Sequence, residues 1–215
     1  IGTTTPNLAG FEVATRTIAF NSGADGSLGV WDASSSAQLI TTRYNFGTVA
    51  ANGYIYTLGG TRPGCDSCSD VLYGKLNSNG SVVSWATSTN ALPVSLSRVP
   101  AVVANGYIYV VGGNSGAAVS VSTVYYAKIN SNGEVSAWQT SANALISPRS
   151  GNSLVVANGY IYSLGGGQAD YITAPSPTVF YAKLNGDGST GSWASTTNPL
   201  PGPLSLHSSI IANGY

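Results

Sequence analysis

ANGYIYTLGG, at residues 51–60, is the stretch that decides the fold, because the chain repeats it at a regular interval. ANGYIYVVGG follows at residues 104–113 and ANGYIYSLGG at residues 157–166, and ANGY at residues 212–215 begins another copy. The starts at 51, 104, 157 and 212 are separated by 53, 53 and 55 residues. A fixed period of this length is the signature of a repeat architecture, in which one supersecondary unit is used several times.

Two turns recur in every repeat, each marked by a glycine that follows Asn or Asp. One is the Asn-Gly inside the ANGY string, and the glycine of the other lies five residues before a tryptophan. The tryptophans are Trp31, Trp85, Trp138 and Trp193, and the turn pairs before them are Asp25-Gly26, Asn79-Gly80, Asn132-Gly133 and Asp187-Gly188. Both turns are expected to be type I′, because Asn-Gly and Asp-Gly supply the two positive φ angles that this hairpin turn needs.

Four short antiparallel strands are expected in each repeat. The outgoing strand of the tryptophan hairpin is expected at 73–77, 125–130 and 180–185, with a degenerate copy at 16–21, and each tryptophan lies on the return strand. The other pair is an apolar strand before ANGY, at 99–104, 154–157 and 209–212, and the Tyr-Ile-Tyr strand after it. No long stretch has the apolar spacing of a helix. Four strands in about 53 residues form one blade of a β-propeller, whose blades bury their faces by stacking.

The same residues resemble the kelch repeat. The resemblance is carried by the diglycine after an apolar strand, a downstream Tyr, then a Trp and then a Leu, with Arg43 and Arg149 eight residues before their ANGY strings. The Tyr-to-Trp interval is twelve positions, as from Tyr73 to Trp85, which is longer than in usual kelch repeats and similar to divergent repeats of microbial surface proteins. The resemblance implies an all-β propeller of four-stranded antiparallel blades, which binds partners through loops on one rim.

Residues 1–215 are interpreted as a single domain of this type, or a fragment of one, with four repeats. Residues 1–3 are similar to the end of the Tyr-Ile-Tyr strand at 58–61, so both ends of the chain fall within the same strand of the repeat. Two explanations stay open. Four blades close by joining the termini in one strand, or the chain is a window from an array of about six to eight blades, which we favour.

Composition excludes several classes of partner. Charged residues make up 7% of the chain, and eight basic residues balance eight acidic ones. Without a basic stripe, nucleic acid is not an expected partner, and no apolar run reaches the roughly 18 residues of a membrane-spanning helix. A low-charge surface rich in Ser, Thr, Asn and Gly indicates an extracellular or cell-surface protein.

Cys65 and Cys68 are the only cysteines. A thioredoxin-type redox role requires a strand–helix context, and a zinc site requires two more ligands, neither of which the sequence provides. We therefore expect a small disulfide that closes one exposed loop, which fits an oxidising compartment.

Catalysis, metal binding and cofactor binding are not expected. His207 is the only histidine, whereas a His-based metal site, or the copper chemistry known on kelch propellers, needs more. No Gly-x-Ser-x-Gly elbow supports a Ser–His–Asp triad, and Asp25, Asp187 and the cluster at 66–70 lack EF-hand spacing. Asn79 begins a glycosylation sequon, but it also occupies a tight turn.

A propeller keeps its framework constant and carries function on its loops. The loops after the diglycines differ most between repeats, at 61–70, 114–120 and 167–177, with 3–14 in the first copy. The candidate contacts with a ligand or partner are Arg62, Asp66, Asp70, Asp170 and Tyr171. We expect a non-catalytic binding or adhesion module for protein or glycan; the alternatives are a self-assembling subunit of a surface fibre or sheath and, less favoured, a hydrolase or oxidase on a propeller scaffold.

Overall fold

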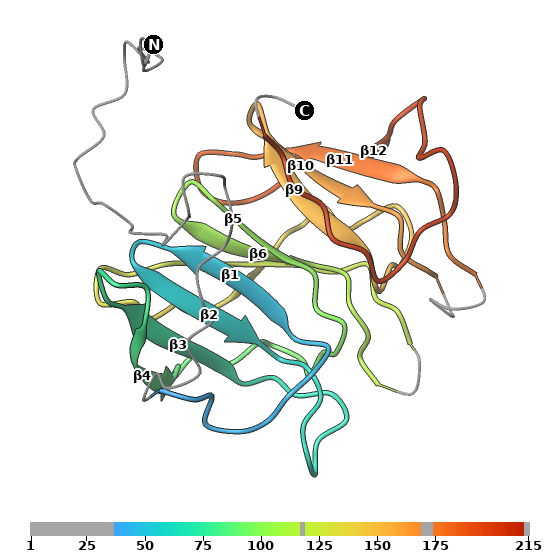
Figure 1. The fold of residues 1–215 in the computed structure, drawn as a ribbon. Helices are drawn as coiled ribbons and strands as arrows, with labels where there is room; N and C mark the ends of the chain where they lie inside the picture. The colour runs from blue at the N-terminus through green and yellow to red at the C-terminus, as the bar shows by residue number, and fades with distance from the viewer. Residues whose placement is uncertain (1–36, 117–118, 169–173, 213–215) are drawn as a thin grey trace, which may run out of the picture.

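A computed structural model describes residues 37–116, 119–168 and 174–212. These residues form three antiparallel sheets of four strands each and contain no helix (Figure 1). The first sheet contains β1 (Gly47–Ala51), β2 (Tyr54–Leu58), β3 (Val71–Leu76) and β4 (Val82–Thr87). The second contains β5 (Ala101–Ala104), β6 (Tyr107–Val111), β7 (Val124–Lys128) and β8 (Gln139–Thr140). The third contains β9 (Ser153–Ala157), β10 (Tyr160–Leu164), β11 (Val179–Lys183) and β12 (Ala194–Ser195).

Each sheet is a simple meander, in which consecutive strands are neighbours. The first strands of the three sheets lie side by side, because β5 contacts both β1 and β9 (Figure 1). The expected all-β fold with one four-stranded sheet per repeat is therefore confirmed for three repeats. The hairpin expected around Asp25, Gly26 and Trp31 lies outside the described residues, and residues 209–212 are described but do not form the expected strand.

The Asn-Gly turns of the ANGY strings have the predicted geometry. Asn52 and Gly53 have φ angles of 52° and 78°, and Asn105 and Gly106 have 50° and 79°. Positive φ at both central positions defines type I′, which matches the right-handed twist of the flanking strands.

The second turn was expected to be type I′ as well, and this expectation is wrong. Gly80 is left-handed at φ 84°, but Asn79 before it is not, and the same holds in the other two repeats. The Gly80 amide donates to the Asn77 carbonyl at 3.0 Å, and the Asn77 amide donates to the Ser81 carbonyl at 2.8 Å. The loop therefore has three residues, 78–80, and the glycine is the last residue of the four-residue turn 77–80. The Asn79 carboxamide oxygen accepts from the Ser81 amide at 3.1 Å, which favours this longer loop.

The tryptophan of each repeat joins its sheet to the preceding segment. The indole Nε1 of Trp138 donates to the Asn90 carbonyl at 3.2 Å, and that of Trp193 donates to the Asn143 carbonyl at 3.2 Å. Trp85 makes the equivalent bond to Ala37 at 3.1 Å. Trp85 lies in β4 as predicted, whereas Trp138 and Trp193 directly precede the short strands β8 and β12, so the expected return strand is shorter there.

Two of the turn glycines, Gly133 and Gly188, pack on tyrosine rings of the preceding sheet. A Cβ at Gly188 would lie 2.5 Å from the ring of Tyr107, and a Cβ at Gly133 would collide in the same way with the ring of Tyr54. Behind these rings, Tyr56 and Tyr109 are fully buried. Their hydroxyl groups have no hydrogen-bond partner among the described residues.

The diglycines allow the next linker to approach the sheet. Gly59 has φ 56°, and a Cβ there would lie 2.6 Å from the carbonyl oxygen of Leu96. Gly60 donates to that carbonyl at 2.8 Å, and Leu96 donates to the Cys68 carbonyl at 2.9 Å. The equivalent hydrogen bonds recur in the other two repeats. Gly113 donates to the Arg149 carbonyl and Gly166 donates to the Leu204 carbonyl, each at 2.8 Å. The repeat therefore needs glycine both for backbone conformation and for close approach.

Two apolar clusters lie between neighbouring sheets. One includes Tyr56, Leu58 and Ile108 from the first and second sheets, and the other includes Tyr109, Ile161 and Phe180 from the second and third. Burial between sheets rather than within one sheet explains why a single repeat could not be stable alone.

Candidate binding surface

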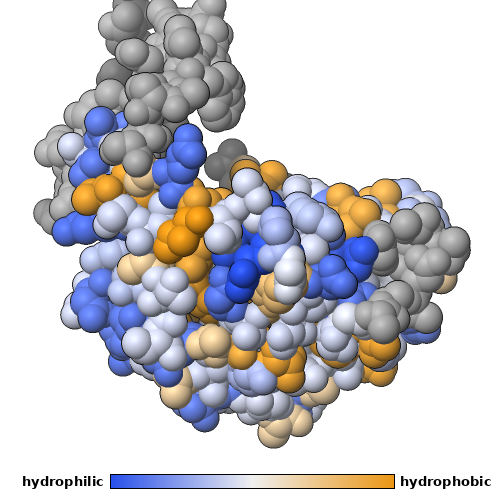
Figure 2. Space-filling view, turned by 90° about the horizontal axis from the view of Figure 1, so that it is seen from below, coloured by the Kyte–Doolittle hydropathy of each residue, from blue (hydrophilic) through white to orange (hydrophobic). Residues whose placement is uncertain are grey.

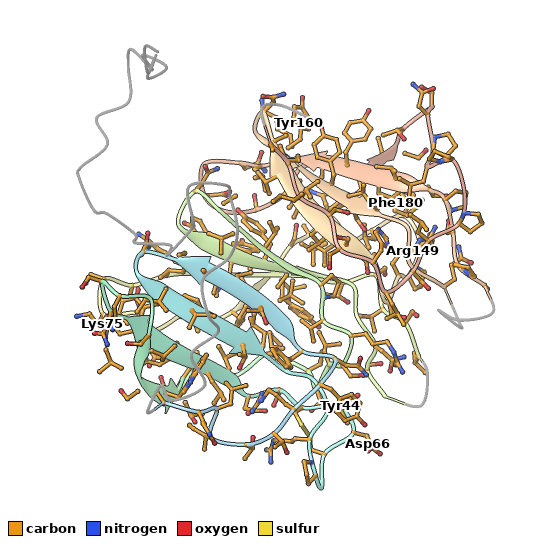
Figure 3. The ribbon with its side chains drawn as sticks, in the orientation of Figure 1. Tyr44, Asp66, Lys75, Arg149, Tyr160 and Phe180 are labelled. Carbon is orange, nitrogen blue, oxygen red and sulfur yellow. A yellow bond between two sulfur atoms is a disulfide. The ribbon has the colours of Figure 1, made fainter. Side chains whose placement is uncertain are left out.

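The two rims of the sheets differ in the kind of loop they carry. One rim holds the ANGY and tryptophan hairpin turns, and we name it the hairpin rim. The other holds the loops after the diglycines and the linkers between sheets, and we name it the loop rim. Tyr44 and Asp66 lie near each other at the loop rim, whereas Lys75 and Tyr160 lie at the hairpin rim (Figure 3). The loop rim is the one that the sequence predicted to carry function.

A closed loop projects from the first sheet on the loop rim. Cys65 and Cys68 form a disulfide with a Cα–Cα distance of 5.8 Å, and the described part of the chain has no free cysteine. Arg62 and Cys65 exchange two backbone hydrogen bonds of 2.9 Å each, and the Thr61 hydroxyl donates to the Asp66 carbonyl at 2.8 Å. These bonds and the disulfide fix the backbone around Asp66, so we name residues 61–68 the cystine loop.

Three of the predicted contacts lie on or next to this loop, and they differ in exposure. Asp66 is exposed, and the side chain of Arg62 is 36% exposed. Asp70 instead pairs with Arg43 at 2.6 Å, and Arg43 has a side chain only 1% exposed. The Nε of Arg62 lies 3.8 Å from the Asp70 carboxylate. Asp70 therefore acts as a support that holds Arg43 and positions Arg62. The other two predicted contacts, Asp170 and Tyr171, lie outside the described residues.

Arg149 occupies the position in the third repeat that Arg43 has in the first. It is 3% exposed, and its guanidinium lies 4.9 Å from the centre of the Phe180 ring (Figure 3). It donates to the Pro148 carbonyl at 3.0 Å and to the Ser176 hydroxyl at 3.4 Å, and burial lowers the pKa of the guanidinium. Both arginines are therefore part of the framework under the rim.

Three adjoining cavities form a groove across the loop rim. The outer cavity, about 430 Å³, is lined by residues that include Tyr44, Arg62 and Asp66. The middle cavity, about 210 Å³, shares Tyr44 and Asp66 with the outer one and adds Asn114. The inner cavity, about 360 Å³, shares Arg98 with the middle one. We name the three together the rim groove.

The inner cavity lies where equivalent segments of four repeats meet. Its lining includes residues 45–48, 98–101, 151–154 and 206–209, whose starts are separated by 53, 53 and 55 residues. The first residue of each segment is left-handed, with φ of 56°, 49°, 65° and 54° at Asn45, Arg98, Gly151 and Leu206. The repeat thus places one sharp backbone turn from each copy around a common opening.

His207 lines this inner cavity. Both of its imidazole nitrogens are buried without a hydrogen-bond partner among the described residues, and burial lowers its pKa. A neutral ring packed against Gly165 fits this environment, since a Cβ on that glycine would lie 2.9 Å from the His207 ring.

Tyr44 lines the groove but was not among the contacts predicted from the sequence. Its side chain is exposed, at 61%, whereas most other tyrosines of the sheets are packed against a neighbouring ring. The equivalent positions in the other repeats are Ser97, Ser150 and Ser205. A comparison between repeats of the same chain could have identified it, because a framework position would have kept one residue type.

Asn114 lines the middle cavity and holds a buried, unpaired donor. Asn114 is 2% exposed, and its carboxamide oxygen accepts from the Gly116 amide at 2.9 Å. Its Nδ2 has no partner among the described residues. An unpaired buried amide is costly, so a position of this kind needs an explanation.

The surface on this side of the molecule is polar and mixed. Seen from below the view of Figure 1, apolar residues form small separate groups among polar ones (Figure 2). Within the described ranges, no group of three or more His, Cys, Asp or Glu side chains is arranged to hold a metal ion. The described residues also include no helix long and apolar enough to cross a membrane.

Comparisons with known proteins relate this chain to others by fold alone. No model of a known protein family matches it, and no curated protein sequence matches it. Among solved structures, it is similar to that of YjhT, with a TM-score of 0.59 and 16% sequence identity. The match covers 76% of this chain and 54% of YjhT, so the chain spans about half the length of that protein.

Proposed function

We propose that this chain is a non-catalytic, extracellular or cell-surface binding module that contacts a protein or glycan through the loop rim of its first described sheet. The observation that carries the proposal is the rim groove, where exposed Tyr44 and Asp66 and partly exposed Arg62 line cavities that continue to the common opening. The disulfide of the cystine loop supports an oxidising compartment.

Two departures from the repeat lie at this groove. The framework residues, namely the turn glycines, the tryptophans and the packed tyrosines, recur in each sheet. Tyr44 and the cystine loop have no counterpart in the other two described sheets. Residues that break an internal repeat without serving its packing favour a ligand-binding role.

Binding of the purified chain to protein and glycan arrays tests this proposal. The R62A/D66A double variant removes two side chains that line the groove and lie outside the sheet core, and it is expected to lose every hit. The matched control is K75A/K128A, which changes two exposed side chains of β3 and β7 outside the groove. Binding that is lost equally in the control, or an absence of hits on both arrays, would contradict the proposal.

The finer architecture that we propose is a kelch-like β-propeller with each sheet as one blade. The support is the side-by-side placement of β1, β5 and β9 and the recurrence of the tryptophan and glycine contacts between sheets. A crystal structure tests this arrangement. It is expected to show the first strands of all blades around one axis, and sheets stacked in an open row would contradict it.

A structural role in a fibre or sheath is the second candidate, and one face of the third sheet favours it. Tyr56 and Tyr109 are each 0% exposed under the next sheet, but the equivalent Tyr162 is only partly buried. A stacked sheet of the same kind would cover it. Sedimentation of the chain distinguishes the candidates: a species that stays at 21.8 kDa at high concentration excludes self-assembly through this face.

A further inference from the structure

We infer that the rim groove binds an oligosaccharide, with the ring of Tyr44 as the stacking surface and Asp66 and Asn114 as the hydrogen-bonding groups. This inference rests on the proposed function and selects one of its two ligand classes. It follows from the chemistry of the groove, taken one feature at a time.

The first feature is the mixture of hydrogen-bonding groups. The Asp66 carboxylate can only accept, whereas the unpaired Nδ2 of Asn114 can only donate. Both residues line the middle cavity. A hydroxyl group both donates and accepts, so a ligand with several hydroxyl groups suits a cavity whose lining contains both kinds of group.

The second feature is an isolated aromatic ring beside these groups. Tyr44 is 61% exposed and lines both the outer and the middle cavity. An aromatic side chain combines a flat apolar face with a polar tip, which suits a ligand with an apolar face and a polar edge. A pyranose ring has this form, because its C–H groups gather on one face and its hydroxyl groups lie around the edge.

The third feature argues against a protein ligand. Protein interfaces centre on a buried apolar or aromatic cluster. The middle cavity instead is lined mainly by polar residues, such as Thr61, Ser67 and Ser97. Tyr44 is the one aromatic residue among those that line it. A chain of sugar units, rather than an apolar side-chain anchor, matches this lining.

The fourth feature is length. The outer and middle cavities share Tyr44 and Asp66, and the middle and inner cavities share Arg98. A linear ligand can therefore run from the cystine loop toward the common opening. We expect affinity to rise with the number of sugar units until the groove is filled, and then to stay constant.

The test uses a glycan array that spans neutral and acidic oligosaccharides of one to eight units, followed by calorimetry on the strongest hit. The Tyr44→Ser variant introduces the residue found at the equivalent positions, and it is expected to weaken binding by at least about tenfold. Asp66→Asn keeps the shape of the side chain and is expected to weaken binding to a similar extent. Tyr160→Ser, on the hairpin rim, is the matched control and is expected to bind as the unchanged protein does.

Circular dichroism and thermal unfolding verify that each variant is folded, and Tyr44→Phe provides a second test because it keeps the ring. Tyr44→Phe is expected to retain most of the affinity. An array with no glycan hit, or a hit unaffected by Tyr44→Ser and Asp66→Asn, would overturn the inference. Hits on the protein array alone, lost in R62A/D66A, would overturn the oligosaccharide inference and leave the proposed binding function intact.

Discussion

Gly112 lies in direct contact with the backbone carbonyl oxygen of Arg149, so closely that a side chain at this glycine would collide with it. The amide of the next residue, Gly113, donates to the same carbonyl at 2.8 Å. This contact joins the end of β6 to the linker that enters the third sheet. It explains why a diglycine ends the Tyr-Ile-Tyr strand in every complete repeat.

The Gly112→Ala variant is expected to lower the free energy of unfolding by about 3 kcal/mol, since it adds a collision to the cost of a left-handed alanine. Gly106→Ala is the control. Gly106 has nearly the same φ, 79° against 81°, but nothing lies within 4 Å of its added Cβ. The control should lose only about 1 kcal/mol in denaturant unfolding. Equal losses in the two variants would show that the close approach does not contribute.

Trp138→Phe tests the bond that the tryptophans make to the preceding linker. The variant keeps an aromatic ring but removes the indole donor to the Asn90 carbonyl. A loss of about 1 kcal/mol in unfolding free energy is expected, together with some loss of packing. Trp193→Phe removes the equivalent bond and should behave alike. An unchanged midpoint in urea for both variants would argue against the bond as a stabilising contact between sheets.

The buried tyrosines make stability sensitive to high pH. Burial raises the pKa of Tyr56 and of Tyr109 from 10.0 to about 12. Because the folded state holds these protons more tightly, their contribution is present below pH 10 and is lost as the pH rises toward 12. The Y56F/Y109F variant removes two hydroxyls without partners, so it should be at least as stable at pH 8 and should lose less stability between pH 10 and 12. A variant with the same alkaline dependence as the unchanged protein would contradict this explanation.

His207 makes stability sensitive to low pH in the opposite sense. Burial lowers its pKa below the ordinary value of 6.5, so the unfolded chain binds a proton more readily than the folded one. The stabilising effect of the neutral ring is therefore present above pH 6.5 and is lost as the pH falls. Thermal unfolding at pH 8 and pH 5 should show a smaller decrease in His207→Gln than in the unchanged protein. A decrease of the same size in both would assign the acid sensitivity to other groups.

The sequence predicted best the features that depend on only a few neighbouring residues. The type I′ turns at Asn52-Gly53 and Asn105-Gly106 follow from two residues each, and they were predicted correctly. The turn at Asn79-Gly80 was not, because the side chain of Asn79 and the position of Gly80 select a longer loop that the dipeptide alone does not specify.

The candidate site was harder to predict because it depends on contacts between segments far apart in the chain. Asp70 was predicted to contact a ligand or partner, but its pairing with Arg43, 27 residues earlier, makes it a support. Tyr44 precedes the first complete repeat string and was not considered, although it meets Asp66 at the groove. The Asn114 donor likewise becomes visible only when the first and second sheets are placed together.

Hydrogen–deuterium exchange of the chain with and without its array-selected ligand tests the central claim most directly. If the loop rim of the first sheet is the binding surface, protection should appear in peptides that cover residues 42–45, 61–68, 96–99 and 114–116. The ANGY turns of the hairpin rim, at 52–53 and 105–106, should exchange as they do without ligand. Protection confined to the hairpin rim, or to the tyrosine face of β10 and β11, would contradict the claim that this protein binds through the rim groove.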